Sequence, residues 1–442
     1  MVSSGKTRVG VRSANIKGYI PQPQNMEDRP PHVPNLNIAD LAYDLPPQRI
    51  AAEPLPERDA SKLLVANGST GEISHDVFRN LPVLLPEGSA LVVNTTRVIR
   101  ARLTFRKPTG GVVEILLTNP VEPSVDPAQA LLVRSSTAWN CLVGGRNVVP
   151  EMILTNDADP NRILRATVVK RFESEALVRF DWNTDDAFGD IVSDLGSLPL
   201  PPYLGRDADE ADDVRYQTVY AEHSGSVAAP TAGLHFTERT FADLASKNVQ
   251  RFDVTLHVGL GTFKPVNVAD ARDHTMHRER IGIHHHELQR LAEYCQNPSS
   301  WITAVGTTSL RTLESLYRFG VQLLREPLLP PSQLDVAQWA CYDSKDNLPS
   351  RSEAFRAVVQ WGEQRGETMI WGETGLLIGP GCTVRSADAL VTNFHQPGNT
   401  LLLLVAGFVG TDLCRRIYQE ALENNYRFLS YGDSSYLIRA DV

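Results

Sequence analysis

The chain has 442 residues and a formal net charge of −9, with 42% hydrophobic and 21% charged residues. This length favours two or three domains, and the composition is typical of an ordinary soluble globular protein. The negative charge argues against a protein that coats nucleic acid through bulk charge, although phosphate recognition needs only a local basic patch. No apolar run reaches the roughly 20 residues that span a bilayer, and the N-terminal stretch lacks the apolar core of a secretory signal.

Residues 1–36 are polar and carry four basic side chains before the first acidic one, so we expect a flexible N-terminal extension. A solvated tail and a weak phosphate-contacting arm both fit this composition. Ordered structure is expected from near Ile38, with strands at Leu63–Val65 and Ala90–Val93 in an α/β segment over residues 37–102.

The most basic stretch of the chain follows this segment and contains Arg97, Arg100 and Arg102. Several cations on one extended segment suit contact with a nucleic-acid backbone, and a solvated face is the plainer alternative.

Between residues 103 and 182 the pattern changes to six short β-rich runs separated by Gly, Asn, Asp and Pro turns. Even spacing without a helical period predicts a small antiparallel β-barrel or sandwich inserted into the α/β domain. The runs are Val112–Leu117, Ala130–Arg134, Trp139–Val143, Val148–Leu154, Ile163–Phe172 and Ala176–Phe180.

The α/β pattern then resumes with a loop, a helix and a strand. Thr237 is placed to cap the helix, and Arg251–Val258 alternates strictly between polar and apolar residues, as a strand does. His235 lies in the small-residue loop, and His257 precedes Gly259-Leu-Gly261 at the end of the strand. This unit is expected to form the wall of a ligand site.

Residues 183–442 complete the α/β domain. Gly306-Thr-Thr-Ser309 follows a strand and begins a helix, which suits either an anion site or a plain helix cap. Residues 322–367 lack a steady period and are expected to be a surface insertion. Other expected elements are helices at Glu287–Cys295, Leu310–Phe319 and Leu413–Asn424, strands at Trp301–Val305, Ala389–Phe394 and Tyr426–Tyr431, and a buried strand or helix start at Leu401–Val409.

Metal and redox signals are weak. His274, His277 and Glu279 lack the i, i+4 pairing of a zinc helix, so no metal site is predicted. Five dispersed cysteines without a CxxC pair predict reduced thiols and a cytoplasmic location. They are Cys141, Cys295, Cys341, Cys382 and Cys414. Residue patterns alone therefore indicate an α/β enzyme with a histidine-containing site, and they do not reach a reaction.

Longer segments are more specific, and they occur in one order along the chain. They are Tyr43–Pro46, Pro54–Arg58, Val93–Leu103, Gly110–Glu114, Leu198–Tyr203, Tyr216–Tyr220, Val227–Phe236, Val254–Phe263, His274–His277, Ala304–Ser315, Val391–His395 and Tyr426–Asp433. Through them the chain resembles the S-adenosylmethionine:tRNA ribosyltransferase-isomerase family of queuosine biosynthesis. The resemblance implies transfer of the ribosyl part of S-adenosylmethionine to 7-aminomethyl-7-deazaguanine at the tRNA wobble position. Epoxyqueuosine forms, and adenine and methionine are released.

The resemblance also implies that no metal or redox cofactor is needed, and that the acceptor is a tRNA with a GUN-type anticodon. We expect a monomer without membrane contact. His235 and His257 are the candidates for general acid/base catalysis. Glu314 and Asp433 are the candidate partners of a cationic intermediate. Substrate-binding candidates are Thr231, Gly233, Gly259, Gly261, Thr262, Thr307, Thr308, Arg311, Asn393, His395 and Tyr431, and Arg97, Arg100 and Arg102 are the tRNA-contacting candidates.

The chain departs from the family pattern at three places: Thr374–Ile378, Gln396–Thr400 and Gly432–Ser435. Two alternatives therefore stay open. One is a divergent paralogue that uses S-adenosylmethionine on a free base or small molecule, and the other is an inactive tRNA-binding protein.

Overall fold

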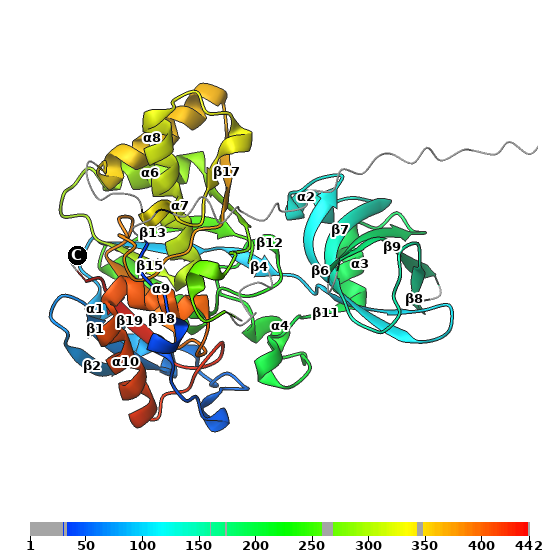
Figure 1. Cartoon of the computed structure of the whole chain (residues 1–442), viewed down its shortest axis with the longest axis horizontal. Helices are drawn as coiled ribbons and strands as arrows, with labels where there is room; N and C mark the ends of the chain where they lie inside the picture. The colour runs from blue at the N-terminus through cyan, green and yellow to red at the C-terminus, as the bar shows by residue number, and fades with distance from the viewer. Residues whose placement is uncertain are drawn as a thin grey trace, which may run out of the picture.

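The computed structural model describes residues 30, 33–159, 161–172, 175–258, 268–342 and 348–440. They form an α/β body around a ten-stranded sheet, with a separate antiparallel β-barrel beside it (Figure 1). The predicted fold class, an α/β main domain with an inserted β-barrel, is confirmed.

The large sheet has ten strands with parallel pairing at its centre. In spatial order the strands are β16 (Asp335–Val336), β17 (Met369–Thr374), β14 (Glu279–His284), β13 (Gln250–Leu256), β3 (Ala90–Asn94), β15 (Ile302–Val305), β18 (Ala389–Asn393), β19 (Ser434–Ile438), β1 (Lys62–Asn67) and β2 (Ile73–Val77). Strands β13, β3, β15 and β18 are parallel to one another, so their carboxyl ends lie along one edge of the sheet.

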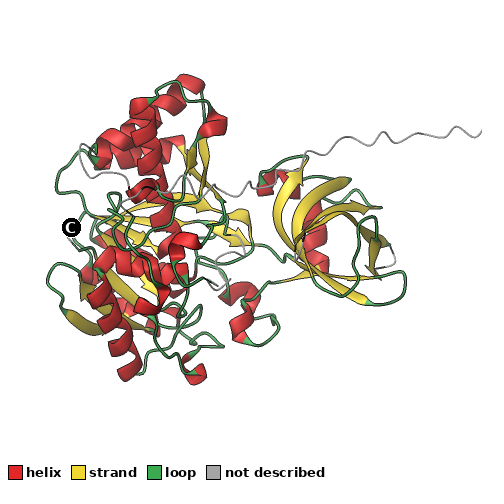
Figure 2. Ribbon diagram, in the orientation of Figure 1, coloured by secondary structure: helices red, strands yellow, loops and turns green. Residues whose placement is uncertain are grey.

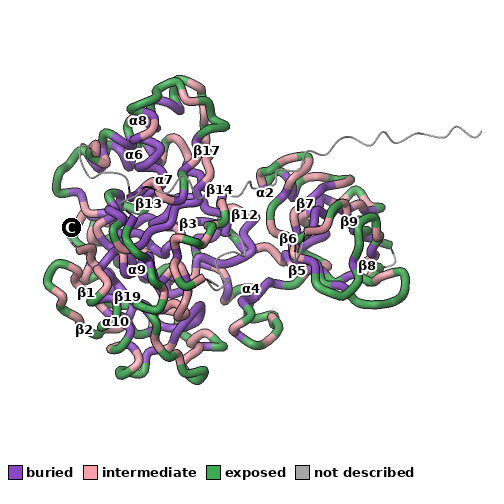
Figure 3. Tube along the Cα trace, viewed as in Figure 1, coloured by how far each residue is buried: buried purple, intermediate pink, exposed green. Residues whose placement is uncertain are grey.

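Helices cover both faces of the sheet, because its central strands are apolar on both sides. In β3, Val92 packs into one hydrophobic cluster, whereas Leu91 and Val93 pack into another on the opposite face. The first face carries α6 (His285–Tyr294), α7 (Gly306–Arg325), α8 (Arg351–Arg365), α9 (Thr400–Val409) and α10 (Thr411–Glu423), and the second carries α1 (Leu81–Leu84) and α5 (Glu238–Ser246) with the short 3₁₀ helices η5 (Phe78–Asn80) and η7 (Thr231–His235). Figure 2 shows these helices flanking the strands, and Figure 3 shows burial concentrated between them.

The barrel closes through one pairing between its first and last strands, Arg106 with Thr155. Its strands are β5 (Arg102–Arg106), β6 (Val112–Glu122), β7 (Ser136–Val143), β10 (Glu175–Trp182), β9 (Arg162–Phe172) and β8 (Ile153–Asp159), with β11 (Gly196–Ser197) added to β5. The helices α2 (Pro127–Leu131) and α3 (Phe188–Leu195) pack into the same core. The barrel unit therefore extends to about residue 197, beyond the expected end at residue 182.

Two short strands and several small helices complete the body. Strand β4 (Thr96–Val98) pairs in parallel with β12 (His223–Ser226) close to the chain crossings into the barrel (Figure 1). The remaining helices are η2 (Ile38–Leu41), η3 (Pro47–Arg49), η4 (Arg58–Ala60), η6 (Pro202–Leu204), α4 (Asp212–Arg215), η9 (Ala271–Asp273), η10 (Pro331–Gln333) and η11 (Ala340–Tyr342).

Several local expectations were wrong. The run Ala130–Arg134 is not a strand, because Asp126 caps a helix that begins at Pro127. Tyr426–Tyr431 is a loop, and the strand there is β19. The stretch 322–367 is not a surface insertion, because α7 extends to Arg325 and α8 packs into the body core.

The ends of the chain and the thiols also differ from expectation. Val33 and Leu36 are buried in the body core, so packing begins before residue 37, and residues 1–29 and 31–32 lie outside the described residues. Cys341 and Cys382 form a disulfide, which corrects the expectation of five reduced thiols, and the other three cysteines are free and buried. Within the described ranges, no helix has both the length and the apolar character needed to cross a membrane.

Candidate functional site

The carboxyl edge of the parallel strands gathers most of the expected site residues. In open α/β sheets, ligands bind outside the carboxyl ends of the strands. Here His257 follows β13, Gly306 follows β15, and Phe394 and His395 follow β18. The helix η7, which ends at His235, packs against this edge.

Helix α7 offers an anion-binding end. Its 20 residues begin after Val305, which makes no side-chain cap bond, so within the described ranges the N–H groups of the first turn have no capping side chain. Gly306 has φ +87°, and a Cβ there would lie 3.7 Å from Ala232, which places η7 beside this helix end. Thr307 and Thr308 occupy the first turn, as expected for a carboxylate or phosphate site.

Arg311 lies one turn further along α7 and is only 6% exposed. Its Nε donates to the Leu376 carbonyl at 3.2 Å, and its Nη1 donates to Glu279. Its Nη2 has no hydrogen-bond partner among the described residues. Glu279 is thus engaged by a guanidinium, and the part of the chain that the structure describes contains no group of three or more metal-ligating side chains.

A small polar cavity of about 40 Å³ lies at the end of β18. Thr231, Asn393 and His395 line it, and all three were predicted site residues. Its volume is close to the roughly 30 Å³ that one water occupies in the liquid, so it fits a polar group and not a whole nucleobase. Tyr203 and Ser430 also line it, joined by a 2.6 Å hydrogen bond between their hydroxyls.

His235 is buried behind this cavity, with 4% exposed. Its Nδ1 lies 2.8 Å from Ser61 Oγ, and its Nε2 lies 3.1 Å from Asn393 Nδ2. Burial and the positive Arg427 lower the pKa of His235 to about 3. Both ring nitrogens are occupied by protein groups, so this placement favours a positioning role over proton exchange with substrate.

His257 is the more available histidine. Its ring stacks on Trp371 at 6.1 Å, and it is 8% exposed. Its Nδ1 has no hydrogen-bond partner within the described ranges. Burial lowers the pKa of His257 to about 4, opposed by Asp126 and reinforced by Arg280. Among the described residues, His257 stacks on Trp371, whereas His235 bonds to Ser61 and Asn393, so the two histidines have no common partner.

The two candidate carboxylates are both engaged by other groups of the protein. Glu314 is 0% exposed and accepts from Arg318, from the Arg385 and Ser386 backbone N–H groups and from the Ser386 hydroxyl. Asp433 accepts from the backbone N–H groups of Lys62 and Arg427, which ties its loop to β1. Neither carboxylate faces the cavity, so their role as cation partners stays a prediction without support from this geometry.

The other binding candidates are spread around the edge. His395 Nε2 pairs with Thr392 Oγ1 at 3.0 Å, and burial lowers the pKa of His395 to about 4. Tyr431 donates to Asp212 at 2.7 Å, outside the cavity lining. A Cβ on Gly233 would lie 2.1 Å from the Tyr220 hydroxyl, so only glycine fits there. Gly259, Gly261 and Thr262 lie outside the described residues.

The basic stretch is largely paired. Arg100 bonds to Asp213, and Arg102 lies 3.3 Å from Glu114. Arg97 is exposed and donates to the Ala221 carbonyl. In the described part of the chain, no carboxylate forms an ion pair with it.

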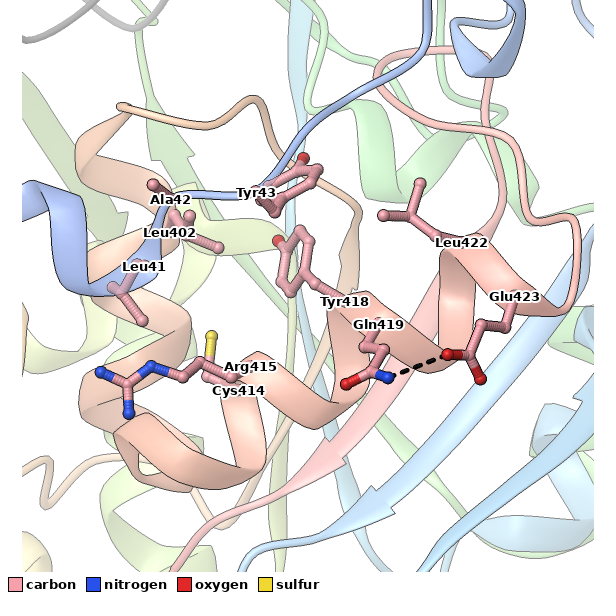
Figure 4. Close-up of a pocket in the computed structure, with 10 residues that line it drawn as sticks. All are labelled: Leu41, Ala42, Tyr43, Leu402, Cys414, Arg415, Tyr418, Gln419, Leu422 and Glu423. Atoms are coloured by element: carbon pink, nitrogen blue, oxygen red, sulfur yellow. Dashed lines mark hydrogen bonds between the residues drawn. The ribbon is translucent and has the colours of Figure 1, made fainter.

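A larger cavity of about 410 Å³ lies between η2 and α10 (Figure 4). Tyr43 and Tyr418 line it, and their hydroxyls bond to the carbonyl and the N–H of His395. The two cavities thus share a wall. Sequence reasoning missed this wall, as well as Ser61, Tyr203 and Ser430, although Tyr43 and Tyr203 lie within the matching segments.

A family model described as "Queuosine biosynthesis protein" matches residues 38–437. The chain belongs to this queuosine biosynthesis family. The resemblance predicted from the sequence segments is confirmed.

Proteins named S-adenosylmethionine:tRNA ribosyltransferase-isomerase are similar over nearly their whole length. One from Azoarcus sp. (strain BH72) is 37% identical, covering 92% of this chain and 99% of the relative. One from Aromatoleum aromaticum is 39% identical, with 91% and 98% covered, and one from Thermotoga maritima is 36% identical, with 91% and 100% covered. A crystal structure of S-adenosylmethionine tRNA ribosyltransferase from Thermotoga maritima is 28% identical, with a TM-score of 0.44 over 90% of this chain and 100% of that one.

Proposed function

We propose that this chain is an S-adenosylmethionine-dependent tRNA ribosyltransferase-isomerase. It transfers the ribosyl part of S-adenosylmethionine to 7-aminomethyl-7-deazaguanine at the wobble position of a tRNA with a GUN-type anticodon. Isomerisation gives epoxyqueuosine, with release of adenine and methionine and without a metal or redox cofactor. The main support is the match at 36–39% identity over about nine-tenths of the chain to proteins that carry this activity in their name.

The methionine carboxylate binds at the start of α7. Two observations on the described residues support this assignment: the first turn of the 20-residue helix has no side-chain cap, and Nη2 of Arg311 has no hydrogen-bond partner there. A helix N-terminus and a guanidinium both favour a negative group. Thr307 and Thr308 supply the N–H groups and hydroxyls closest to that end.

His257 takes the C5′ proton that the adjoining sulfonium makes acidic. It is supported by Nδ1, which has no hydrogen-bond partner in the described part of the chain, and by a lowered pKa, which keeps the ring neutral and able to accept a proton near pH 7. The imidazolium formed in this step is then an acid that can protonate the departing adenine.

The acceptor tRNA meets the protein near Arg97, where β4 and β12 approach the barrel. The chain acts as a monomer in the cytoplasm, where its tRNA substrate is found. No membrane contact is needed.

One incubation separates the proposal from its alternatives. The protein is mixed with S-adenosylmethionine alone, with unmodified tRNA, or with tRNA that carries the deazaguanine base, and free adenine is measured. Adenine released only with the modified tRNA supports the proposal. Release under every condition identifies a small-molecule enzyme, and binding of tRNA without any release identifies an inactive tRNA-binding protein.

A further inference from the structure

A buried hydrogen-bond chain runs from Ser61 through His235 to Asn393 and ends at the small polar cavity. Ser61 is 1%, His235 4% and Asn393 3% exposed, so these hydrogen bonds are almost completely shielded from bulk water. The three residues come from the end of η4, from η7 and from β18, which are far apart in sequence. Of the three, Asn393 lines the cavity, and Ser61 and His235 lie behind it.

The orientation of the Asn393 carboxamide is fixed by its partners. The Leu429 carbonyl lies 3.2 Å from Asn393 Nδ2, and a carbonyl oxygen can only accept, so the amide nitrogen must lie on this side. Asn393 Oδ1 therefore faces Thr231, whose hydroxyl donates to it at 3.0 Å.

This orientation determines the tautomer of His235. The second N–H of Asn393 points at His235 Nε2, so Nε2 must be an acceptor without a proton. The ring proton is then on Nδ1 and is donated to Ser61 Oγ at 2.8 Å. If the ring were doubly protonated, the Nε2–H of His235 would face an N–H of Asn393, and two donors cannot bond to each other.

The charged surroundings agree with a neutral ring. Desolvation is the first cause of the lowered pKa of His235, and the guanidiniums of Arg427 and Arg58 lower it further, whereas a hydrogen bond with the Arg58 backbone acts in the opposite direction. The ring of Phe78 covers another side at 5.1 Å. Asp433 accepts from the Arg427 backbone and lies 3.6 Å from its guanidinium, so it offsets Arg427 and does not touch His235.

We propose that Ser61 and His235 are positioning residues that hold the Asn393 carboxamide in one orientation, and that His235 transfers no proton during the reaction. Both N–H groups of Asn393 are used inside the protein, so its spare capacity is a lone pair on Oδ1. The cavity therefore selects a hydrogen-bond donor of the substrate, such as an amino or hydroxyl group. This inference rests on the proposed function, because it assigns residues within the same site.

Variants of His235 separate positioning from acid/base catalysis. His235→Gln keeps an acceptor near the place of Nε2 and cannot titrate, whereas His235→Ala removes the acceptor. We expect His235→Gln to keep kcat within a few-fold of the wild type, and His235→Ala and Asn393→Ala to lose about 100-fold, the scale of a misplaced catalytic contact. Ser61→Ala falls between them. Equal losses in His235→Gln and His235→Ala would overturn the proposal.

A second readout is independent of turnover. Nitrogen-15 spectra of the histidine rings in the full-length protein, with the His235 signals identified by their loss in His235→Gln, report the tautomer directly. We expect the neutral Nδ1–H form throughout pH 5 to 8. A ring that titrates with a midpoint between 6 and 7 would overturn the proposal even if His235→Ala fails to fold. If the wild type releases no adenine, the proposed function fails, and these spectra still decide the state of His235.

Discussion

Removal of the Glu314 carboxylate tests whether this group stabilises the fold or takes part in catalysis. Glu314 and Arg318 are 0% and 4% exposed, and the carboxylate accepts four hydrogen bonds in α7 and the 385–386 turn. In Glu314→Ala, Arg318 becomes a buried charge whose remaining contacts among the described residues are the Thr383 carbonyl and the Tyr317 ring. Loss of one partner of a buried pair costs about 3–5 kcal/mol.

The buried N–H of Ser386 also loses its acceptor, which raises that cost, whereas the N–H of the exposed Arg385 can bond to water. Each buried donor left without an acceptor costs about 1–3 kcal/mol, and partial relaxation makes these costs less than additive. We therefore expect Glu314→Ala to lower the free energy of unfolding of the sheet body by about 5 kcal/mol, or its melting temperature by about 10–20 °C.

Thermal melting of the full chain, followed by circular dichroism, measures this loss. Glu57→Ala is the matched control, because it removes a carboxylate that is 69% exposed and pairs with a half-exposed Arg79. Exposed pairs contribute about 0–1 kcal/mol, so the control should melt close to the wild type. A Glu314→Ala protein that melts like the control but releases no adenine would refute the structural assignment and restore the catalytic one.

Three further predictions follow from the same geometry. The pKa values of His235 and His257 are lowered from 6.5 to about 3 and about 4. The unfolded chain therefore binds more protons than the folded one between pH 6.5 and 4. The free energy of unfolding must fall as the pH falls through that window, by up to about 1.4 kcal/mol per pH unit for each ring. His235→Gln should show a smaller loss of melting temperature between pH 7.5 and 5, and an equal loss would contradict the buried neutral ring. Gly233→Ala places a Cβ 2.1 Å from the Tyr220 hydroxyl and should cost about 1–3 kcal/mol in melting experiments, an effect that Tyr220→Phe relieves in part if this contact is the cause. Arg311→Lys keeps the positive charge but removes the unpartnered nitrogen, so KM for S-adenosylmethionine should rise about tenfold with a smaller change in kcat; an unchanged KM would place the carboxylate elsewhere.

Local signals in the sequence predicted the central elements well. The alternation over Arg251–Val258 is β13, and Thr237 caps α5 by accepting from the Thr240 N–H. These elements follow from short-range causes, a period of two and a capping side chain, which a single sequence contains.

Other elements depend on contacts that local patterns do not show. Tyr426–Tyr431 has strand-like residues, but Asp433 accepts from the Arg427 N–H and Leu429 has φ 72°, which turns the segment into a loop. Helix α8 is polar in sequence, yet it packs against α6 and α7 in the body core. Its capping box, Ser350 with Glu353, was the local signal that could have revealed it.

The site residues show the same difference between local sequence signals and long-range contacts. Matching segments selected His235, Glu314 and Asn393 as site residues, but their partners decide what each one does. Ser61 lies 174 residues from His235, and Ser386 lies 72 residues from Glu314. Sequence patterns identify residues whose side chains could take part in catalysis. Burial and hydrogen bonds between residues far apart in sequence then distinguish structural and positioning residues from those that contact substrate.

Transfer of a labelled ribosyl group tests the central claim most directly. tRNA carrying 7-aminomethyl-7-deazaguanine is incubated with the protein and S-adenosylmethionine labelled in its ribose carbons, and the tRNA nucleosides are analysed by mass. The account predicts one labelled ribosyl unit at the wobble position of each accepting tRNA, with equal amounts of adenine and methionine released. Label that stays in small molecules, or tRNA that binds and returns unchanged, would contradict it.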